Sequence, residues 1–306
     1  MIKESYSEEE KIEIAKNIKD ISLQTIDKEY EKLKSMIGDI QNISERSKVG
    51  NNIVDYFTFR YRLETKGKYD CNFFDFLANI EEFKKKKFIQ NMFEYYVTVK
   101  NKNNKKNKYI VMKEVYNICI SAINIIRPIV YMQIYDKYKP KKVLDFCAGW
   151  GGAAVASNIM GIEKYIGIDI NSNLAGPYED LIKYLGEKNS DTKIEMYFKD
   201  ALTIDYSAID YDLVFTSPPY YFIQKYQKNE NYNNSKREMD EKFYTPIFTK
   251  VYDGLKPGGY FIINVCKEVY NNVLFKLFGE PHEIFNYGKS QRQNDYKEMI
   301  YCWKKN

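Results

Sequence analysis

One stretch of this 306-residue chain restricts its fold more than any other. Residues 143–146, three apolar and one acidic, are typical of a short buried strand, and the glycine-rich residues 147–152 predict a tight turn into a helix over 153–160. A second apolar run, 165–169, follows that helix and ends in a carboxylate. Strand, glycine turn, helix and strand in this order predict a parallel α/β sheet with helices on both faces.

Two carboxylates follow strands of the predicted sheet. Asp169 lies about twenty residues beyond the glycines, which is the spacing of an acid that binds ribose hydroxyls. Asp200 follows a third predicted strand over 193–198, where it can accept from an adenine amine. Because the carboxyl ends of parallel strands share one edge of the sheet, a nucleoside-binding site is expected there.

A fourth predicted strand, 211–216, ends in the tetrapeptide Ser-Pro-Pro-Tyr at 217–220. Two prolines stiffen the backbone and offer no N–H, so the Pro218 carbonyl can point at a donor. The Ser217 oxygen is a second acceptor, and Tyr220 offers a flat face for an extruded base. Such acceptors suit a planar exocyclic amine, and they bind it more strongly as positive charge develops on its nitrogen.

At these residues, over about 127–303, the chain resembles class I S-adenosylmethionine-dependent methyltransferases. Within them it resembles the nucleic-acid amino-methyltransferases with an (Asp/Asn/Ser)-Pro-Pro-(Tyr/Phe/Trp) motif. The strings KPKKVLDFCAGWGG and VFTSPPYYFIQKY are similar to DNA methyltransferases predicted in phages and large DNA viruses. The resemblance implies S-adenosylmethionine as cofactor, held by Asp145, Phe146, Cys147, Ala148, Gly149, Gly151, Asp169, Ile170, Asp200 and Ala201. It implies a catalytic motif of Ser217, Pro218, Pro219 and Tyr220.

The chain departs from that family in two ways. The glycine turn has Cys147 where the family usually has an aromatic residue, and the bulk of Trp150 has no explanation in the pattern. No large recognition domain fits around the motif, so target choice is expected from the N-terminal region, from residues 222–239, or from another subunit. Tyr221 and Arg292 are further candidates for substrate contact, although a solvated loop residue is the simpler account of Arg292.

Basic residues gather in the N-terminal part of a chain whose formal net charge is +5. Residues 84–113 hold ten lysines and one acid, and polyanions bind such patches through counterion release. Candidate contacts are Lys84, Lys85, Lys105 and Lys106. Interleaved aromatics could stack on bases or could form the core of a small domain: Phe83, Phe88, Phe93, Tyr95 and Tyr96. Residues 101–108 alone could equally be a solvated loop.

The rest of the chain is expected to form two domains, a mainly helical, Lys-rich one over 1–125 and a methyltransferase domain over 126–306. Ser7 and Glu10 form a capping-box pattern that opens a helix continuing towards Met36. Further expected elements are an irregular stretch over 51–75 with a strand at 56–63, and helices over 83–96 and 111–127, the last ended by Pro128. Beyond the motif they are a mobile loop or connector at 222–239, a helix at 240–255, a strand at 260–265 and a C-terminal antiparallel edge strand.

Composition excludes several classes of protein. The five cysteines are scattered without a Cys-x-x-Cys pair and His282 is the one histidine, so neither a disulfide framework nor a metal site is expected. No apolar stretch is long enough to cross a bilayer, and the acidic start MIKESYSEEE is unlike a signal peptide. An intracellular location, cytoplasmic or in a nucleoid or viral factory, is therefore expected, with no membrane partner.

The expected function is methyl transfer to adenine N6 or cytosine N4 in DNA. Ser in the first motif position is commoner among cytosine-N4 enzymes of the resembled class, but adenine-N6 members use it too. An RNA adenine-N6 methyltransferase is the nearest alternative, and a cofactor-binding subunit without turnover is another. A protein glutamine amide as acceptor fits the lysines poorly, and a dehydrogenase leaves 217–220 unexplained.

Overall fold

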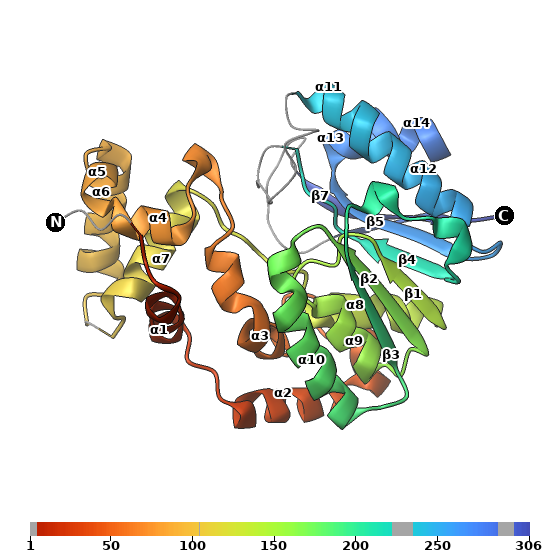
Figure 1. The fold of residues 1–306 in the computed structure, drawn as a ribbon, viewed down its shortest axis with the longest axis horizontal. Helices are drawn as coiled ribbons and strands as arrows, with labels where there is room; N and C mark the ends of the chain where they lie inside the picture. Colours follow the sequence, from red (N-terminus) through yellow and green to blue (C-terminus); the bar gives the residue numbers. More distant parts are fainter. Residues whose placement is uncertain (1–4, 104, 222–234, 287–296) are drawn as a thin grey trace.

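A seven-stranded mixed sheet forms the centre of the computed structural model, which describes residues 5–103, 105–221, 235–286 and 297–306 (Figure 1). The strand order is β3-β2-β1-β4-β5-β7-β6. The bounds are β1 Lys142–Asp145, β2 Lys164–Asp169, β3 Lys193–Phe198, β4 Leu213–Thr216, β5 Tyr260–Cys266, β6 Glu283–Asn286 and β7 Glu298–Lys304. The predicted α/β sheet is confirmed, and its first five strands lie at or within two residues of their expected bounds.

The first five strands are parallel and the last two run against their neighbours. β1 pairs with β2 and with β4 in parallel, whereas β7 pairs antiparallel with β5. The C-terminal strand is therefore antiparallel as expected, but it is not the edge of the sheet, because β6 pairs with its outer side. Chain order reverses between β1 and β4, and such switch points open a crevice at the carboxyl ends of the strands.

Alternate residues of each central strand enter different apolar layers. Val143, Tyr165 and Phe215 pack in one layer, and Leu144, Ile166 and Val214 pack in the other. One set of helices lies on each face of the sheet (Figure 1). On one face they are α8 Pro128–Tyr138, α9 Gly152–Ile159 and α10 Ala175–Lys188. On the other they are α11 Lys236–Met239, α12 Thr245–Gly254, α13 Lys267–Val269 and α14 Phe275–Phe278.

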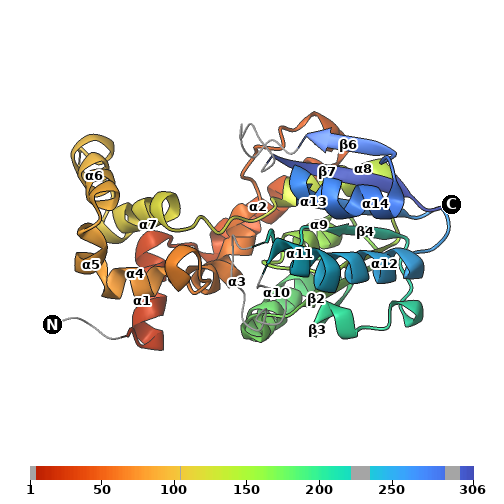
Figure 2. The ribbon, with the colours of Figure 1, turned by 90° about the horizontal axis from the view of Figure 1, so that it is seen from above.

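The N-terminal helices form two groups (Figures 1 and 2). Five of them surround a separate core built on Phe73, Phe76 and Tyr116: α1 Glu8–Ile18, α4 Phe73–Ala78, α5 Ile80–Lys84, α6 Lys87–Tyr95 and α7 Lys108–Cys119. The other two pack beside the sheet against α9 and α10: α2 Leu23–Ser35 and α3 Asn51–Leu63. The expected domain boundary near residue 125 stays a prediction.

The prediction of irregular chain over 51–75 with a strand at 56–63 is wrong, because α3 fills its first half. Aromatic residues give 56–63 a strand-like composition, but burial follows a helical period. Val54 and Thr58 are fully buried one turn apart, whereas Tyr56 is exposed. Tertiary packing against α9 and α10 thus overrides local preference.

Helix bounds differ from the sequence expectation at three other places. The Ser7–Glu10 capping box is confirmed, but the helix ends at Ile18 and Ser22 caps a second one. The helix expected over 83–96 is broken between α5 and α6, and the one expected to 127 ends at Cys119. Pro128 does not end a helix but begins α8, where its missing N–H costs nothing.

Candidate active site

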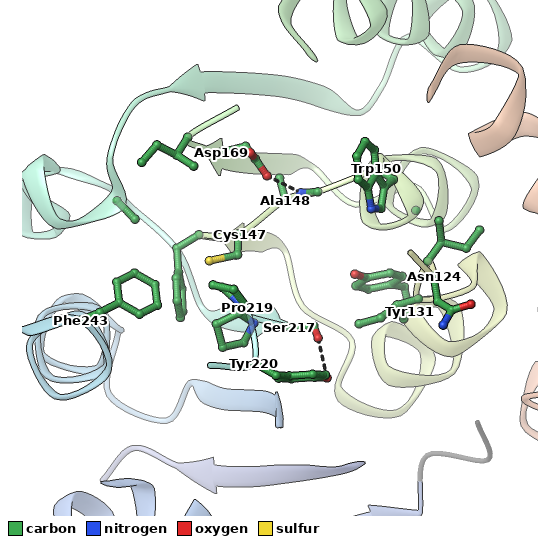
Figure 3. Close-up of a pocket in the computed structure, with 18 of the residues that line it drawn as sticks. Asn124, Tyr131, Cys147, Ala148, Trp150, Asp169, Ser217, Pro219, Tyr220 and Phe243 are labelled. Atoms are coloured by element: carbon green, nitrogen blue, oxygen red, sulfur yellow. Dashed lines mark hydrogen bonds between the residues drawn. The ribbon is translucent and has the colours of Figure 1, made fainter. Parts of the chain in front are cut away.

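A cavity opens at the carboxyl ends of β1, β2 and β4, on the switch point of the sheet (Figure 3). It brings together most of the residues that the sequence singled out. From the predicted cofactor set, the lining includes Phe146, Cys147, Ala148, Gly149, Asp169, Ile170, Asp200 and Ala201. From the predicted catalytic set, it includes Ser217, Pro218, Pro219 and Tyr220. The two sets therefore share one space.

Asp145 does not line the cavity, and its buried side chain instead links β1 to β4. Its carboxylate is fully buried and accepts from the Thr216 hydroxyl at 2.6 Å and from the Cys147 N–H at 3.2 Å. The Tyr165 hydroxyl lies 3.4 Å away. Burial raises the pKa of Asp145 to about 7, against the hydrogen bond from Thr216, which lowers it. Asp145 thus fixes the residue that precedes Ser217.

Asp169 fixes the glycine turn. Its carboxylate accepts from the Gly149 N–H at 2.7 Å and from the Asn171 N–H at 2.9 Å (Figure 3). Burial raises the pKa of Asp169 to about 6. Gly149 has a φ of 55°, in the left-handed region that favours glycine.

Gly151 lies outside the lining and has a packing role. Its φ is 94°, and a Cβ there would meet the Leu181 side chain at 2.7 Å. Glycine at this position therefore lets α10 approach the turn.

Cys147 places a small, neutral side chain in the middle of the cavity (Figure 3). It is half-buried, whereas the other four cysteines are buried. Burial raises the pKa of the Cys147 thiol well above its usual range, and the charges of Asp169, Asp145 and Asp200 raise it further. A raised thiol pKa disfavours the thiolate form, and hence a role as nucleophile, at neutral pH.

The Ser217 and Tyr220 side chains are joined through a residue that the sequence analysis missed. Ser217 Oγ lies 2.9 Å from the Tyr220 hydroxyl. Asn264 Oδ1 lies within hydrogen-bond distance of both hydroxyls, at 3.1 Å from that of Ser217 and 2.7 Å from that of Tyr220. Asn264 is fully buried in β5. The signal that could have found it is one amide in the apolar strand YFIINVC.

The two proline carbonyls have different surroundings. The Pro219 carbonyl oxygen accepts from the Tyr244 hydroxyl, which also accepts from the Tyr221 N–H at 3.2 Å. In the described ranges, no group donates a hydrogen bond to the Pro218 carbonyl oxygen. Tyr244 thus fixes the backbone after the motif, and the Pro218 carbonyl remains available to a ligand.

The walls include residues that the sequence did not single out: Asn124, Ile125, Ile126, Tyr131, Gly152 and Phe243. Trp150 also lines the cavity, and its bulk now has an explanation. Its side chain packs in the apolar layer between the sheet and the N-terminal helices, and its carbonyl oxygen lies 3.2 Å from the Thr58 hydroxyl of α3. The N-terminal half therefore supports the glycine turn directly.

The charge of the lining favours a cationic ligand. Asp169 and Asp200 contribute two carboxylates, and among the described residues no lysine, arginine or histidine joins them. A pyrophosphate in this cavity would face both carboxylates, which disfavours a dinucleotide. A nucleoside with a positive centre fits the same walls.

The remaining candidates for substrate contact lie apart from the cavity. Tyr221 is not in the lining; its ring is buried against Tyr244 and its hydroxyl donates to Asp240 at 2.9 Å. Arg292 and residues 222–234 lie outside the described ranges. The last four residues of the loop expected over 222–239 are not a loop, because they form α11.

The N-terminal lysines are partly compensated by acids that the count over 84–113 did not include. Lys84 pairs with Glu81 and Lys85 with Glu82, both at 2.7 Å. Lys106 pairs with Glu114 at 2.6 Å, and Lys105 is exposed.

The interleaved aromatics divide between core and surface. Phe83, Phe93 and Tyr96 pack in the N-terminal core, whereas Phe88 and Tyr95 are 47% and 42% exposed. The core account is thus confirmed for Phe83, Phe93 and Tyr96, whereas stacking of Phe88 and Tyr95 on bases stays a prediction.

The described ranges lack two further kinds of feature. They contain no group of three or more histidine, cysteine, aspartate or glutamate side chains arranged to hold a metal ion. None of their helices has both the length and the apolar character needed to span a membrane.

Comparisons with known proteins give likeness of structure alone. No protein-family model matches the sequence, and no curated protein matches it either. TehB from Haemophilus influenzae aligns with 64% of this chain and 66% of its own, at 16% identity and a TM-score of 0.40. TrmN from Thermus thermophilus aligns over 58% of this chain and 49% of its own, at 16% identity and a TM-score of 0.39.

A SAM-dependent O-methyltransferase from Thermotoga maritima aligns over 63% of this chain and 69% of its own, at 16% identity and a TM-score of 0.41. The chain thus spans about two thirds of the first of these proteins and half of the second. Scores of this size carry no argument about activity, so the case for function depends on the cavity.

Proposed function

We propose that this chain transfers a methyl group from S-adenosylmethionine to an exocyclic amino nitrogen of a nucleic-acid base, with adenine N6 or cytosine N4 of DNA as the expected acceptor. One observation carries the proposal: the Ser-Pro-Pro-Tyr motif and the glycine turn with its two carboxylates are walls of the same cavity. A donor bound at the turn and an amine bound at the motif would meet there.

The residues of the cavity fit S-adenosylmethionine, which supplies an electrophilic methyl group on a positively charged sulfur. Asp169 would accept from ribose hydroxyls, and Asp200 with Ile170 and Ala201 would enclose the adenine. The negative lining favours the positive sulfur. The small Cys147 leaves room beside it.

The motif would position and activate the accepting amine. An exocyclic amine is a poor nucleophile because its lone pair is delocalised into the ring. Ser217 Oγ and the Pro218 carbonyl can both accept from its two hydrogens, which draws the nitrogen out of the ring plane. These bonds strengthen as positive charge develops on nitrogen, so they stabilise the transition state more than the ground state. The Tyr220 ring lies beside them for stacking.

The N-terminal helices support a nucleic acid as the partner. Exposed Lys105 lies in the segment that leads into α7, and exposed Phe88 and Tyr95 lie on α6 of the same helix group. Basic and aromatic side chains together suit unpaired bases. An RNA substrate fits the same features, and the experiment below decides between the polymers.

The test uses S-adenosylmethionine with a labelled methyl group and separate DNA, RNA and protein substrates. We expect label in nucleosides of digested DNA, and none after the double substitution Ser217→Ala and Tyr220→Ala. Calorimetry should show that the double variant still binds S-adenosylmethionine. If binding is lost together with transfer, the motif has a structural role and the proposal fails.

A further inference from the structure

Asn264 has one orientation that satisfies its surroundings. Its Nδ2 donates to the Met299 carbonyl oxygen of β7 at 3.1 Å. Because a carbonyl can only accept, turning the amide over would place two acceptors together in a fully buried position. Met299 therefore fixes Asn264 Oδ1, an atom that only accepts, towards Ser217 and Tyr220.

The fixed amide determines where the hydroxyl hydrogens point. Ser217 Oγ lies 3.1 Å from Oδ1 and 2.9 Å from the Tyr220 hydroxyl, whose oxygen lies 2.7 Å from Oδ1. Ser217 can donate to Oδ1 directly or through Tyr220. If its hydrogen pointed into the cavity, its lone pairs would face those of Oδ1 at hydrogen-bond distance, which is unfavourable because the Asn264 amide is fully buried. The Ser217 hydrogen is thus directed away from the cavity.

We propose that Asn264 is a positioning residue that holds Ser217 Oγ as a hydrogen-bond acceptor, so that the site takes an amino group and rejects a carbonyl oxygen at the same place on a planar ring. The inference rests on the proposed function and names its specificity. A serine hydroxyl by itself can donate or accept, unlike the carboxylate of an Asp in the same motif position. Asn264 removes that ambiguity.

The selectivity follows from which partner supplies the hydrogen. An amine donates to Ser217 Oγ and to the Pro218 carbonyl, and both bonds are satisfied. A carbonyl oxygen has no hydrogen, so it would face two acceptors, and a buried polar site rejects a ligand that leaves its groups unpaired. Adenine is thus preferred over hypoxanthine, and cytosine over uracil.

The test measures binding of single-stranded oligothymidylates that carry one central variable base, in the presence of S-adenosylhomocysteine, the cofactor without its methyl group. The flanking thymines have no exocyclic amine that could compete for the site. The two oligonucleotides of each pair differ in the central base alone. The wild-type protein should bind the amino member of the adenine/hypoxanthine or the cytosine/uracil pair roughly 10-fold more tightly or better. Asn264→Leu should remove that preference. Persistence of the preference in Asn264→Leu, or its absence from a wild-type protein that methylates an amine, would overturn the inference.

Two further variants separate positioning from packing. Asn158 is a buried amide that accepts from Tyr30 at 2.8 Å and donates to the Asn189 carbonyl at 2.8 Å, outside the cavity lining. Asn158→Leu should lower stability and leave the preference intact. Asn264→Asp should show the preference for the amino base at acidic pH, unlike Asn264→Leu, because a buried, protonated carboxyl can donate to the Met299 carbonyl and accept from Ser217. Failure of this rescue counts against the assignment.

A last measurement keeps this inference apart from the proposed function. If the wild-type protein binds neither S-adenosylhomocysteine nor any oligonucleotide, the proposed function fails. The hydrogen arrangement is then decided by thermal unfolding of Ser217→Ala, Asn264→Leu and their combination. If the double variant loses less stability than the two single variants lose together, the result supports the hydrogen bond between Ser217 and Asn264. Strictly additive losses of stability overturn it.

Discussion

Replacing Asp145 by Asn should make the folded chain more stable at alkaline pH. The Asp145 carboxyl has a pKa of about 7 in the folded chain, because of burial, against 3.8 for the unperturbed group. At about 1.4 kcal/mol for each pH unit, ionising it in place costs ~4 kcal/mol. Asn keeps the acceptor for Thr216 and the Cys147 N–H but carries no charge.

The sign follows from proton binding. Between about pH 4 and pH 7 the folded chain holds a proton on Asp145 that the unfolded chain has released, so stability falls as pH rises through this window. Above pH 7 the wild-type protein bears the full free-energy cost of burying the ionised Asp145, and Asp145→Asn does not. The variant should therefore match the wild type near pH 4 and exceed it at pH 8.

Thermal unfolding at a series of pH values measures the effect. A difference of ~4 kcal/mol corresponds to roughly 10 °C in the unfolding midpoint of a chain of this size. Thr216→Val is the companion variant: it removes a 2.6 Å hydrogen bond to the carboxylate, so its cost should grow with pH. Parallel curves for the wild type and Asp145→Asn would refute the reasoning, because they would mean that Asp145 ionises without a desolvation cost.

Three further predictions concern the cofactor, the polymer and the contact between the two halves. Affinity for S-adenosylmethionine should fall as pH drops through about 6, because protonated Asp169 loses an acceptor. Calorimetry should show that Asp169→Asn binds S-adenosylmethionine weakly at every pH. A wild-type affinity that does not change with pH would contradict the ribose assignment. Neutralising Lys84, Lys85 and Lys105 should reduce the salt slope of DNA binding by about one for each lost phosphate contact, whereas neutralising the three lysines of α2 should not. Equal slopes for the two triple variants would assign Lys84, Lys85 and Lys105 to solubility. Thr58→Val should weaken sinefungin binding several-fold through the turn at Trp150, and unchanged binding would show that α3 does not support the cofactor site.

The sheet could be predicted from the sequence because its signals are local. Apolar runs, the glycine turn and the carboxylates at strand ends follow one another within short segments, and each is restricted by backbone geometry. The site residues at strand ends were therefore found together with the strands. Asp145 was found as well, but its burial beneath the turn depends on the distant Thr216.

The rest of the fold and site depends on contacts between distant segments. Residues 56–63 have the composition of a strand, and only packing against α9 and α10 makes them helical. Asn264 lies 47 residues from Ser217 along the chain, and the acids that pair with Lys84 and Lys85 precede the basic run. The thiol of Cys147 faces the cavity because three strands meet there, which no single segment shows.

The most direct measurement is a crystal structure of the protein with sinefungin, whose amine replaces the transferable methyl group. The account predicts that the ribose lies at Asp169 and that the amine points between Ser217 Oγ and the Pro218 carbonyl oxygen. A ligand bound with its amine directed away from residues 217–220, or bound outside this cavity, would contradict the assignment of the motif to methyl transfer.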